Sequence, residues 1–378
     1  MIGENSNNNK TSFAVCMRTL ALSMALLPSV SLVRAEMPKI TGFVDTTYNY
    51  NFNRPASTST AFRSYDNAAN TILLNNAQLN ISGSVGENTG YVIEPSFGSD
   101  AALNTSAGSG AADDFDLQEA YITYKVPNAP IDFKAGKFVT LEGIEVIESK
   151  DNFLISRGFL FGLAENYTNI GAMTTVSAPK IVSLSVGMIN GWDVMRDNNT
   201  GKSLISKIGL NFGDMLNGGF VVYYGPEKSG NTNDQRFSFD STWFSKPCDK
   251  LTLALQFNAG TEEKSAAAGT VNAGGLSHWY GASFQPKIKL CDRTSLGARY
   301  EWFQSLDGDR ATSANALVPP GIVLQNLSIA PTLNLTESLM FRVEYRYDWS
   351  SQVAFETADG SFSNSTQNTL SSQVIYSF

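Results

Sequence analysis

Large apolar side chains recur at every second position along short stretches of this chain, and this period of two limits what the chain can fold into. In residues 341–349 the positions between the apolar residues are all charged. Successive side chains of a β-strand point to opposite faces of the sheet, so as a strand this stretch has one apolar and one ionic face. The pattern therefore predicts an all-β protein. The same alternation is found in residues 120–126, 236–240, 251–257, 284–290 and 296–302.

Counting such stretches predicts sixteen antiparallel strands, and a missed or split hairpin would make this 14 or 18. An even number places both ends of a barrel chain on the same, periplasmic side of the membrane. The predicted strands are residues 39–53, 71–85, 90–99, 115–126, 131–140, 165–177, 180–191, 202–213, 217–226, 235–246, 251–261, 276–290, 294–306, 321–334, 338–352 and 367–378.

A soluble β-sandwich also alternates, so the period alone does not select the fold. The connections favour a transmembrane barrel, because tight turns alternate along the chain with long segments rich in Gly, Ser and Asn. Tyr, Trp and Phe also cluster at strand ends, where aromatic girdles meet the two membrane interfaces. The tight turns are residues 86–89, 127–130, 214–216 and 247–249.

The last stretch of the chain, residues 373–378, alternates and ends on Phe378 with Tyr376 two residues before it. This ending resembles the C-terminal strand signal of bacterial outer-membrane barrel proteins. The resemblance implies that Tyr376 and Phe378 act as an assembly signal. It also implies three partners: the outer-membrane barrel assembly machinery, membrane lipid and lipopolysaccharide.

A barrel of this size implies a function. No backbone polar group can stay unbonded in lipid, so the sheet must close, and about sixteen strands enclose an aqueous channel. We therefore expect an outer-membrane porin for passive diffusion of ions and small hydrophilic solutes. Many sixteen-stranded porins are trimers, so a homotrimer is one option. The alternative is a surface-interaction or structural barrel protein of adhesin or envelope type, with little channel activity.

The N-terminal segment has a different character. Basic residues precede an apolar stretch over residues 19–33, which ends just before Ala35. The stretch is shorter than the roughly 20 residues of a membrane-spanning helix and is typical of a secretory signal peptide. We expect a signal peptide over residues 1–35, with Met17 as an alternative start, and one β-barrel domain over residues 36–378.

One connection, residues 141–164, is too apolar to lie free in water. It falls between the fifth and sixth predicted strands, where general porins carry a segment that folds into the barrel and narrows it. Glu142, Glu145 and Glu148 are three residues apart, so a helix would align their carboxylates on one face. We predict that these residues and Arg157 line a constriction. The alternatives are a solvated acidic face, or a loop packed outside over the barrel mouth.

The opposing charges would come from basic residues on the polar faces of later strands. Opposite charges across a narrow opening focus the electric potential there and select ions. The alternative is that the arginines pair with Glu301, Glu344 and Asp348 on their own face. The predicted pore-wall residues are Arg236, Lys287, Lys289, Arg299, Arg342 and Arg346.

Little in the sequence suggests catalysis or a cofactor. Beyond the predicted signal peptide the one histidine, His278, stands beside a Trp as an interfacial residue does, and no Asp–His pair of the kind that barrel proteases use is evident. Cys248 and Cys291 lack zinc-ligand spacing and form either a disulfide or two reduced thiols. The net charge of −8 argues against nucleic acid. We expect no enzyme activity, cofactor or metal.

The region from about residue 130 to 205 resembles the putative β-barrel porin-2, OmpL-like family of Gram-negative bacteria, and the strand rhythm extends the likeness over most of the chain. The resemblance implies an outer-membrane diffusion channel. After Arg157 the family usually has Ser, Pro and a His-Thr-Gly motif, whereas this chain has Gly158 and no His there. The resemblance rests on Gly136, Lys137, Phe138, Thr140, Gly143, Glu145, Glu148, Ser149, Asn152, Ser156, Arg157, residues 190–193 and 197–199, and Lys202.

Overall fold

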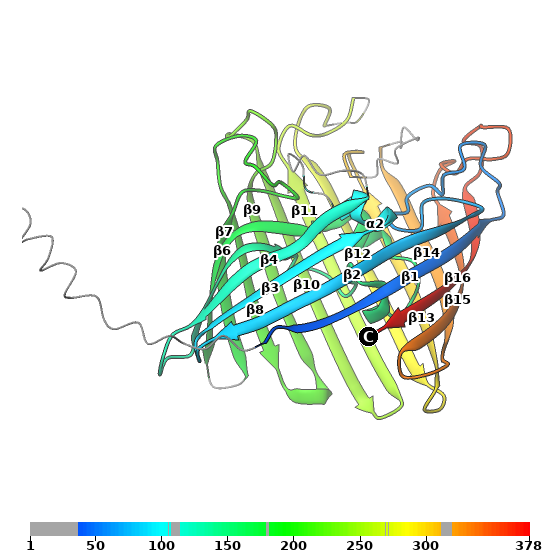
Figure 1. The fold of residues 1–378 in the computed structure, drawn as a ribbon. Helices are drawn as coiled ribbons and strands as arrows, with labels where there is room; N and C mark the ends of the chain where they lie inside the picture. The colour runs from blue at the N-terminus through cyan, green and yellow to red at the C-terminus, as the bar shows by residue number, and fades with distance from the viewer. Residues whose placement is uncertain are drawn as a thin grey trace, which may run out of the picture.

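The computed structural model describes residues 37–104, 106, 114–178, 181–268, 270, 272–310 and 320–378. Within these residues sixteen antiparallel strands form one closed barrel, in which β16 pairs with β1 and each other strand pairs with its neighbours in the chain (Figure 1). The predicted fold class and strand number are thereby confirmed. The predicted signal peptide, residues 1–35, lies outside the described residues. No helix in the described part of the chain is long and apolar enough to cross a membrane.

Short helical segments, α2 (Ser99–Asn104), η1 (Ser149–Asp151), η2 (Leu160–Ala164) and η3 (Gly213–Met215), lie in the connections. The strands are β1 (Lys39–Asn51), β2 (Thr71–Val85), β3 (Thr89–Phe97), β4 (Phe115–Lys125), β5 (Ile131–Val139), β6 (Thr168–Ala178), β7 (Val182–Ile189), β8 (Ser203–Asn211), β9 (Asn217–Pro226), β10 (Gln235–Cys248), β11 (Leu251–Glu262), β12 (Ser277–Lys289), β13 (Thr294–Ser305), β14 (Ile322–Asn334), β15 (Leu339–Ser350) and β16 (Thr366–Ser377).

Most boundaries agree with the predicted ones, and β2 and β9 agree at both ends. The sixth strand differs because it begins at Thr168 and not at Glu165. The Glu165 carboxylate accepts a hydrogen bond from Gln256 across the lumen, and the Asn166 side chain donates to the carbonyl oxygen of Thr168 at 3.2 Å. These side-chain contacts hold the two residues in the preceding loop.

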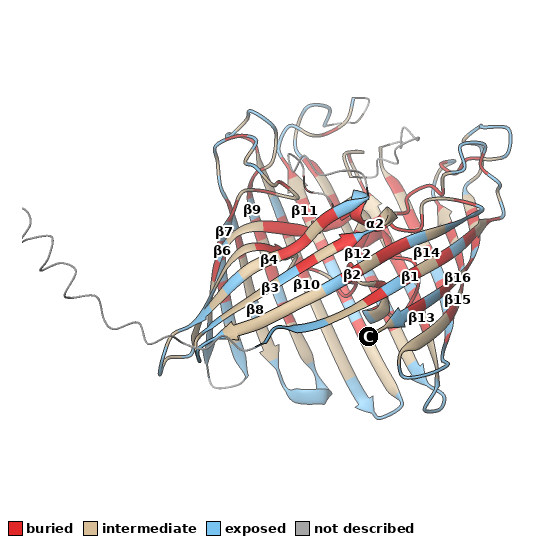
Figure 2. Ribbon diagram, in the orientation of Figure 1, coloured by how far each residue is buried: buried red, intermediate tan, exposed pale blue. Residues whose placement is uncertain are grey.

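Burial along the strands is the reverse of that in a soluble protein. On β15 the charged residues Glu344, Arg346 and Asp348 are at most 1% exposed, whereas Tyr345 between them is 44% exposed. Figure 2 shows the alternation of buried and less buried positions along the strands. The apolar faces therefore point outward, and the polar faces point into the barrel. This arrangement excludes a pair of sheets stacked through apolar faces.

The two rims of the barrel differ in the lengths of their connections. The short turns lie at one rim, where β1 begins and β16 ends, and the long connections lie at the other (Figure 1). Gly42 and Phe378 exchange two backbone hydrogen bonds of 3.0 Å that close the barrel at the short-turn rim. The side chains of Tyr376 and Phe378 are 50% and 56% exposed on its outer surface.

Candidate functional site

The connection between β5 and β6, residues 140–167 and here called loop 3, lies inside the barrel. Glu344 on β15 accepts hydrogen bonds from the backbone N–H groups of Ile155 and Ser156 at 2.6 and 2.9 Å. Glu301 on β13 accepts bonds from the backbone of Phe159 and Leu160 at 2.5 and 2.9 Å. These glutamates point inward, so the loop must occupy the lumen. The predicted infolding is confirmed, and a position outside the mouth is excluded.

The three glutamates of loop 3 do not share a helical face, so that part of the prediction is wrong. No helix forms over residues 141–148, and Gly143 adopts a positive φ of 89° that breaks helical geometry. The loop is extended because its polar groups bind opposite walls of the barrel. Glu142 accepts a hydrogen bond from Ser238 on β10, Glu145 pairs with Arg299 on β13, and Glu148 accepts bonds from Gln78 on β2 and Gln118 on β4.

Carboxyl groups from the two ends of loop 3 cluster with a carboxyl group of the barrel wall. Glu142 and Glu165 lie close to Asp240 of β10, and the Gln256 side chain donates hydrogen bonds to both Glu165 and Asp240. Burial, with a smaller contribution from Asp240, raises the pKa of Glu142 to about 8 and that of Glu165 well above its usual value. One carboxylate oxygen of each glutamate is buried without a hydrogen-bond partner in the structure. Burial therefore favours the protonated form of both groups.

Three of the predicted wall bases bind loop 3 directly. The guanidinium groups of Arg299, Arg342 and Arg346 donate to the loop carbonyl oxygens of Ser156, Leu154 and Arg157 at 2.8, 2.7 and 2.6 Å, respectively. All three side chains are at most 2% exposed. The arginines thus clamp the loop against the wall and do not face it across open water.

The other three predicted wall bases lie away from this clamp. Arg236 pairs with Glu262 at 2.6 Å, and the Lys287 ammonium lies 5.3 Å from the ring centroid of Phe153. Lys289 is exposed beside the short turn that follows β12 and pairs with Asp292. The alternative prediction is that wall arginines pair with acidic residues on their own face of the sheet. Arg346 does so, with Asp348 at 2.6 Å, whereas Glu301 and Glu344 accept hydrogen bonds from loop 3.

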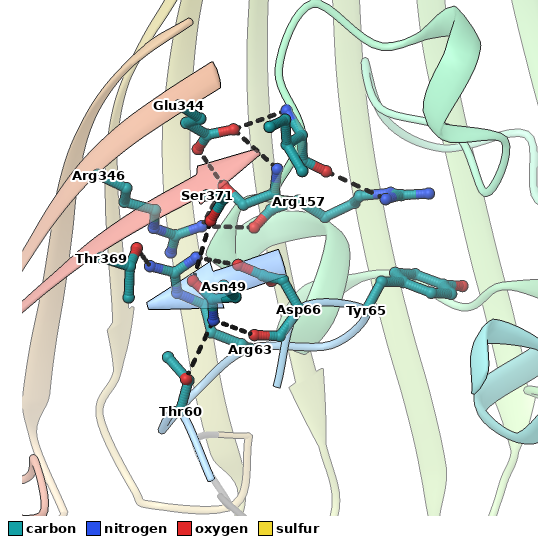
Figure 3. Close-up of polar contacts among 12 residues, drawn as sticks. Asn49, Thr60, Arg63, Tyr65, Asp66, Arg157, Glu344, Arg346, Thr369 and Ser371 are labelled. Carbon is teal, nitrogen blue, oxygen red and sulfur yellow. Dashed lines mark hydrogen bonds and ion pairs between the residues drawn. The ribbon is translucent and has the colours of Figure 1, made fainter. Parts of the chain in front are cut away.

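The connection between β1 and β2, residues 52–70 and here called loop 1, also folds inward, which the sequence interpretation missed. Its Arg63 pairs with Asp66 of the same loop (Figure 3), and it also pairs with Asp348 on β15. The guanidinium of Arg157 in loop 3 stacks 4.4 Å from the ring centroid of Tyr65. Arg63 and Tyr65 in a loop without glycine were the available signal, because residues of this size in a free loop would be exposed.

Apolar clusters fill part of the lumen at the level of these loops. Phe62 of loop 1 and Phe159 of loop 3 belong to a buried cluster with inward residues of β12–β14. A second cluster lies against β5 and β7–β9 and has Phe138, Ile189 and Tyr223 among its members. The lumen is therefore a packed interior on these two sides.

Three open cavities among the described residues border loop 3 on the side of the short-turn rim. The largest, of about 740 Å³, is lined by Leu141 and by inward residues of β6–β10, with Lys207 as its basic group. A second, of about 330 Å³, lies under Phe153 and is lined by Lys250, Lys287 and Lys289. The third, of about 540 Å³, is lined by Glu94, Glu119 and Glu148. Asp249 and Asp292 also line the second cavity and offset two of its lysines, so the third cavity has the more one-sided charge.

The cysteines and the histidine do not form a catalytic or metal site in the described residues. Cys248 and Cys291 are exposed free thiols on separate short turns, so the possible disulfide is not formed. The expected lack of an Asp–His pair is wrong, because His278 Nδ1 lies 3.0 Å from Asp307 across neighbouring strands. The adjacent Ser277 hydroxyl bonds elsewhere, to Asp309 at 2.5 Å. No group of three His, Cys, Asp or Glu side chains there could hold a metal ion.

Comparisons with known proteins identify similar sequences and folds. The model of the family described as putative beta-barrel porin-2, OmpL-like, matches residues 38–378. No curated protein matches the chain in sequence. An anion-selective porin from Comamonas acidovorans is similar in structure, with a TM-score of 0.62 at 10% identity over 91% of this chain and 100% of that one.

Two further solved structures share the fold. The outer membrane channel DcaP of Acinetobacter baumannii has a TM-score of 0.59 at 15% identity, over 92% of this chain and 99% of that one. The trimer form of OmpT, an outer membrane protein of Vibrio cholerae, has a TM-score of 0.57 at 12% identity, over 90% of this chain and 99% of that one. At these identities the likeness extends to the barrel alone.

Proposed function

The chain belongs to the putative beta-barrel porin-2, OmpL-like family, and on that premise we propose that it is an outer-membrane porin for passive diffusion of ions and small hydrophilic solutes. The observation that carries this proposal is the closed sixteen-stranded barrel with apolar side chains outside and charged ones inside. A barrel of this size is wide enough to enclose water. The transport is non-enzymatic and needs no cofactor.

We place the constriction at loop 3. Its hydrogen bonds to β10, β13 and β15 support this position, because a segment held on several walls must cross the lumen. We assign Glu142, Glu145, Glu148 and Arg157 of the loop to this constriction. Arg299, Arg342 and Arg346 hold the loop, while Arg236, Lys287 and Lys289 act as pore-wall charges above and below it.

The proposal includes export and assembly in the bacterial outer membrane. The apolar outer surface suits contact with lipid and lipopolysaccharide, and residues 1–35 are the signal peptide removed on export. The exposed Tyr376 and Phe378 are the signal for the barrel assembly machinery. The trimer form of the Vibrio cholerae protein of similar fold supports a homotrimer.

A structural or surface-interaction barrel is the second candidate, and the packing of loops 1 and 3 favours it. Phe62 of loop 1 and Phe159 of loop 3 are at most 6% exposed in the lumen, so the two loops fill space that an open pore would leave to water. If this candidate is correct, the folded protein will insert into membranes without conducting ions.

Conductance across a planar lipid bilayer tests the proposal. The refolded or membrane-extracted protein, shown to be folded by a mobility shift on heating in SDS, should give stepwise KCl currents. The control for preparation and insertion of the protein is the substitution Leu335→Arg. Leu335 lies in the short turn after β14, so its replacement leaves the lumen and the long loops unchanged. Insertion of heat-modifiable protein without current would refute the channel and favour the second candidate.

A further inference from the structure

Two β-bulges, one in β2 and one in β4, add inward-pointing polar side chains to the sector of the lumen wall formed by β1–β4. In the pairing of β1 with β2 the register shifts between Asp45 and Thr46, which makes Asn75 an extra residue. In the pairing of β3 with β4 the register shifts after Glu94, which makes Gln118 an extra residue. A β-bulge turns two consecutive side chains toward the same face. Asn75 and Asn76, and likewise Gln118 and Glu119, therefore all point inward and are buried.

Glu119 of this sector lines the acidic cavity of about 540 Å³ under loop 3, together with Gln78, Glu94 and Glu148. The Gln78 side chain lies between two of its carboxylates and donates to Glu94 at 3.1 Å and to Glu148 at 3.4 Å. Asn80 donates a second bond to Glu94, and the backbone N–H of Val139 donates to Glu119 at 2.9 Å. The carboxylates are thus fixed in place by neutral donors.

Nearby lysines have other partners. Lys150 pairs with Asp151 at 2.5 Å at the edge of the cavity, and Lys137 pairs with Asp116 at 2.8 Å. Lys134 of β5 lies over the rings of Tyr121 and Phe138, at 4.3 and 5.6 Å from their centroids. In the described residues none of these ammonium groups forms an ion pair with Glu94, Glu119 or Glu148. The three carboxyl groups of the cavity are therefore left without a lysine partner.

Two buried amide oxygens in the same sector have no hydrogen-bond partner. Gln118 is fully buried and donates its amide N–H to Glu148, which leaves its Oε1 unbonded. Asn76 is 2% exposed and donates to Gln78 Oε1 at 3.2 Å, which leaves its Oδ1 unbonded. Turning the Gln118 amide over would place its oxygen against a carboxylate, so its orientation is fixed. The sector thus has acceptors in excess and lacks donors.

We propose that this cavity is a binding subsite for organic cations that carry an ammonium or guanidinium group, on the diffusion path of the proposed porin. Such a group supplies three to five N–H donors and a positive charge, which match the three carboxylates that line the cavity. The unbonded amide oxygens of Gln118 and Asn76 lie beside the lining, because each side chain donates to a residue of it, Glu148 and Gln78 respectively. Amide side chains separate the carboxylates, and no described group of acidic residues could hold a metal ion, so an organic cation fits the sector better than a metal. The inference rests on the proposed function.

The experiment uses arginine amide, which carries both cationic groups, added on the short-turn side of bilayers holding the full-length folded protein. It should block the KCl current at millimolar concentration. The double variant Glu94→Gln/Glu119→Gln should raise the half-blocking concentration at least about tenfold, because each change removes a charge-assisted interaction. Glu87→Gln, in the short turn between β2 and β3, is the matched control and should leave the block unchanged.

Calorimetric titration of the same proteins in detergent separates the two levels of the proposal. If arginine amide binds to the protein with measurable heat and the double variant does not bind it, the subsite is supported even when no KCl current is found. In that case only the porin function fails. A normal KCl current without block or heat overturns the subsite and leaves the porin standing. Binding of Ca²⁺ and not of arginine amide also overturns it. Glu148→Gln in loop 3 should repeat the effect if the strand variants fail to fold.

Discussion

Arg299 on β13 and Glu145 in loop 3 form a buried ion pair in which Nη1 lies 2.6 Å from Oε1. Their side chains are 0% and 5% exposed. Glu145 also accepts a hydrogen bond from the backbone of Gly158 at 2.6 Å, so the pair joins both arms of loop 3 to one wall. The course of the loop through the lumen depends on this contact.

Arg299→Gln should loosen loop 3. Removing one member of a buried ion pair leaves the other charge uncompensated, which costs about 3–5 kcal/mol. We expect a lower free energy of unfolding in urea titrations and a larger, noisier KCl conductance. Lys246→Gln, which breaks an exposed pair with Asp214 at the short-turn rim, is the control and should change neither. Equal effects of the two substitutions would argue against the anchoring role of Arg299.

Arg63→Ala should release loop 1 from the wall. The Arg63 guanidinium contacts Asp66, Asp348 and Thr369, and its removal leaves the buried Asp66 without a cation and leaves Asp348 with Arg346 alone. We expect faster cleavage within loop 1 by chymotrypsin, followed on gels of the folded protein. Arg54→Ala changes an exposed arginine of the same loop and should leave the cleavage rate unchanged.

Stability should fall as pH rises through the range in which Glu142 titrates. Its pKa is raised from 4.5 to about 8 in the folded protein, so between these values the folded state binds more protons than the unfolded state. One such group contributes a slope of at most about 1.4 kcal/mol per pH unit. Urea unfolding from pH 5 to pH 9 should show a shallower slope in Glu142→Gln. Glu165 titrates in the same direction, so the slope should decrease without vanishing.

Leu327→Arg should destabilise the barrel in lipid by about 2–4 kcal/mol, the cost of a lipid-facing arginine near the middle of the bilayer. Leu327 lies midway along β14 and is 54% exposed on the outer surface. Leu335→Arg places the same side chain in a short turn outside the strands and should cost little. Similar stabilities of the two variants in vesicles would contradict an outward lipid-facing surface.

Cys248 and Cys291 should both react with a maleimide in the folded protein, because both thiols are free and exposed. Mass spectrometry of the exported protein should find two labels without prior reduction. A third label would come from Cys16 and would show that residues 1–35 are retained. No label before reduction and two afterwards would indicate that a disulfide forms.

The strand pattern was predictable because its cause is local. Each inward or outward position follows from the one before it, so β2 and β9 were bounded correctly from alternation alone. The bulges at Asn75 and Gln118 break this rule through pairing with a neighbouring strand, which no single stretch of sequence reveals. The His278–Asp307 pair was missed for the same reason, since it joins β12 to the connection that follows β13.

By itself the sequence determined that this chain makes a barrel of sixteen strands with polar residues inside, because side-chain alternation and lipid solvation leave one way to satisfy the backbone. Only the tertiary structure decided how the lumen is filled. Glu142, Glu145 and Glu148 are evenly spaced in the sequence, yet each binds a different strand of the wall once loop 3 crosses the barrel. Their partners lie tens to hundreds of residues away, and only closure of the barrel brings them together.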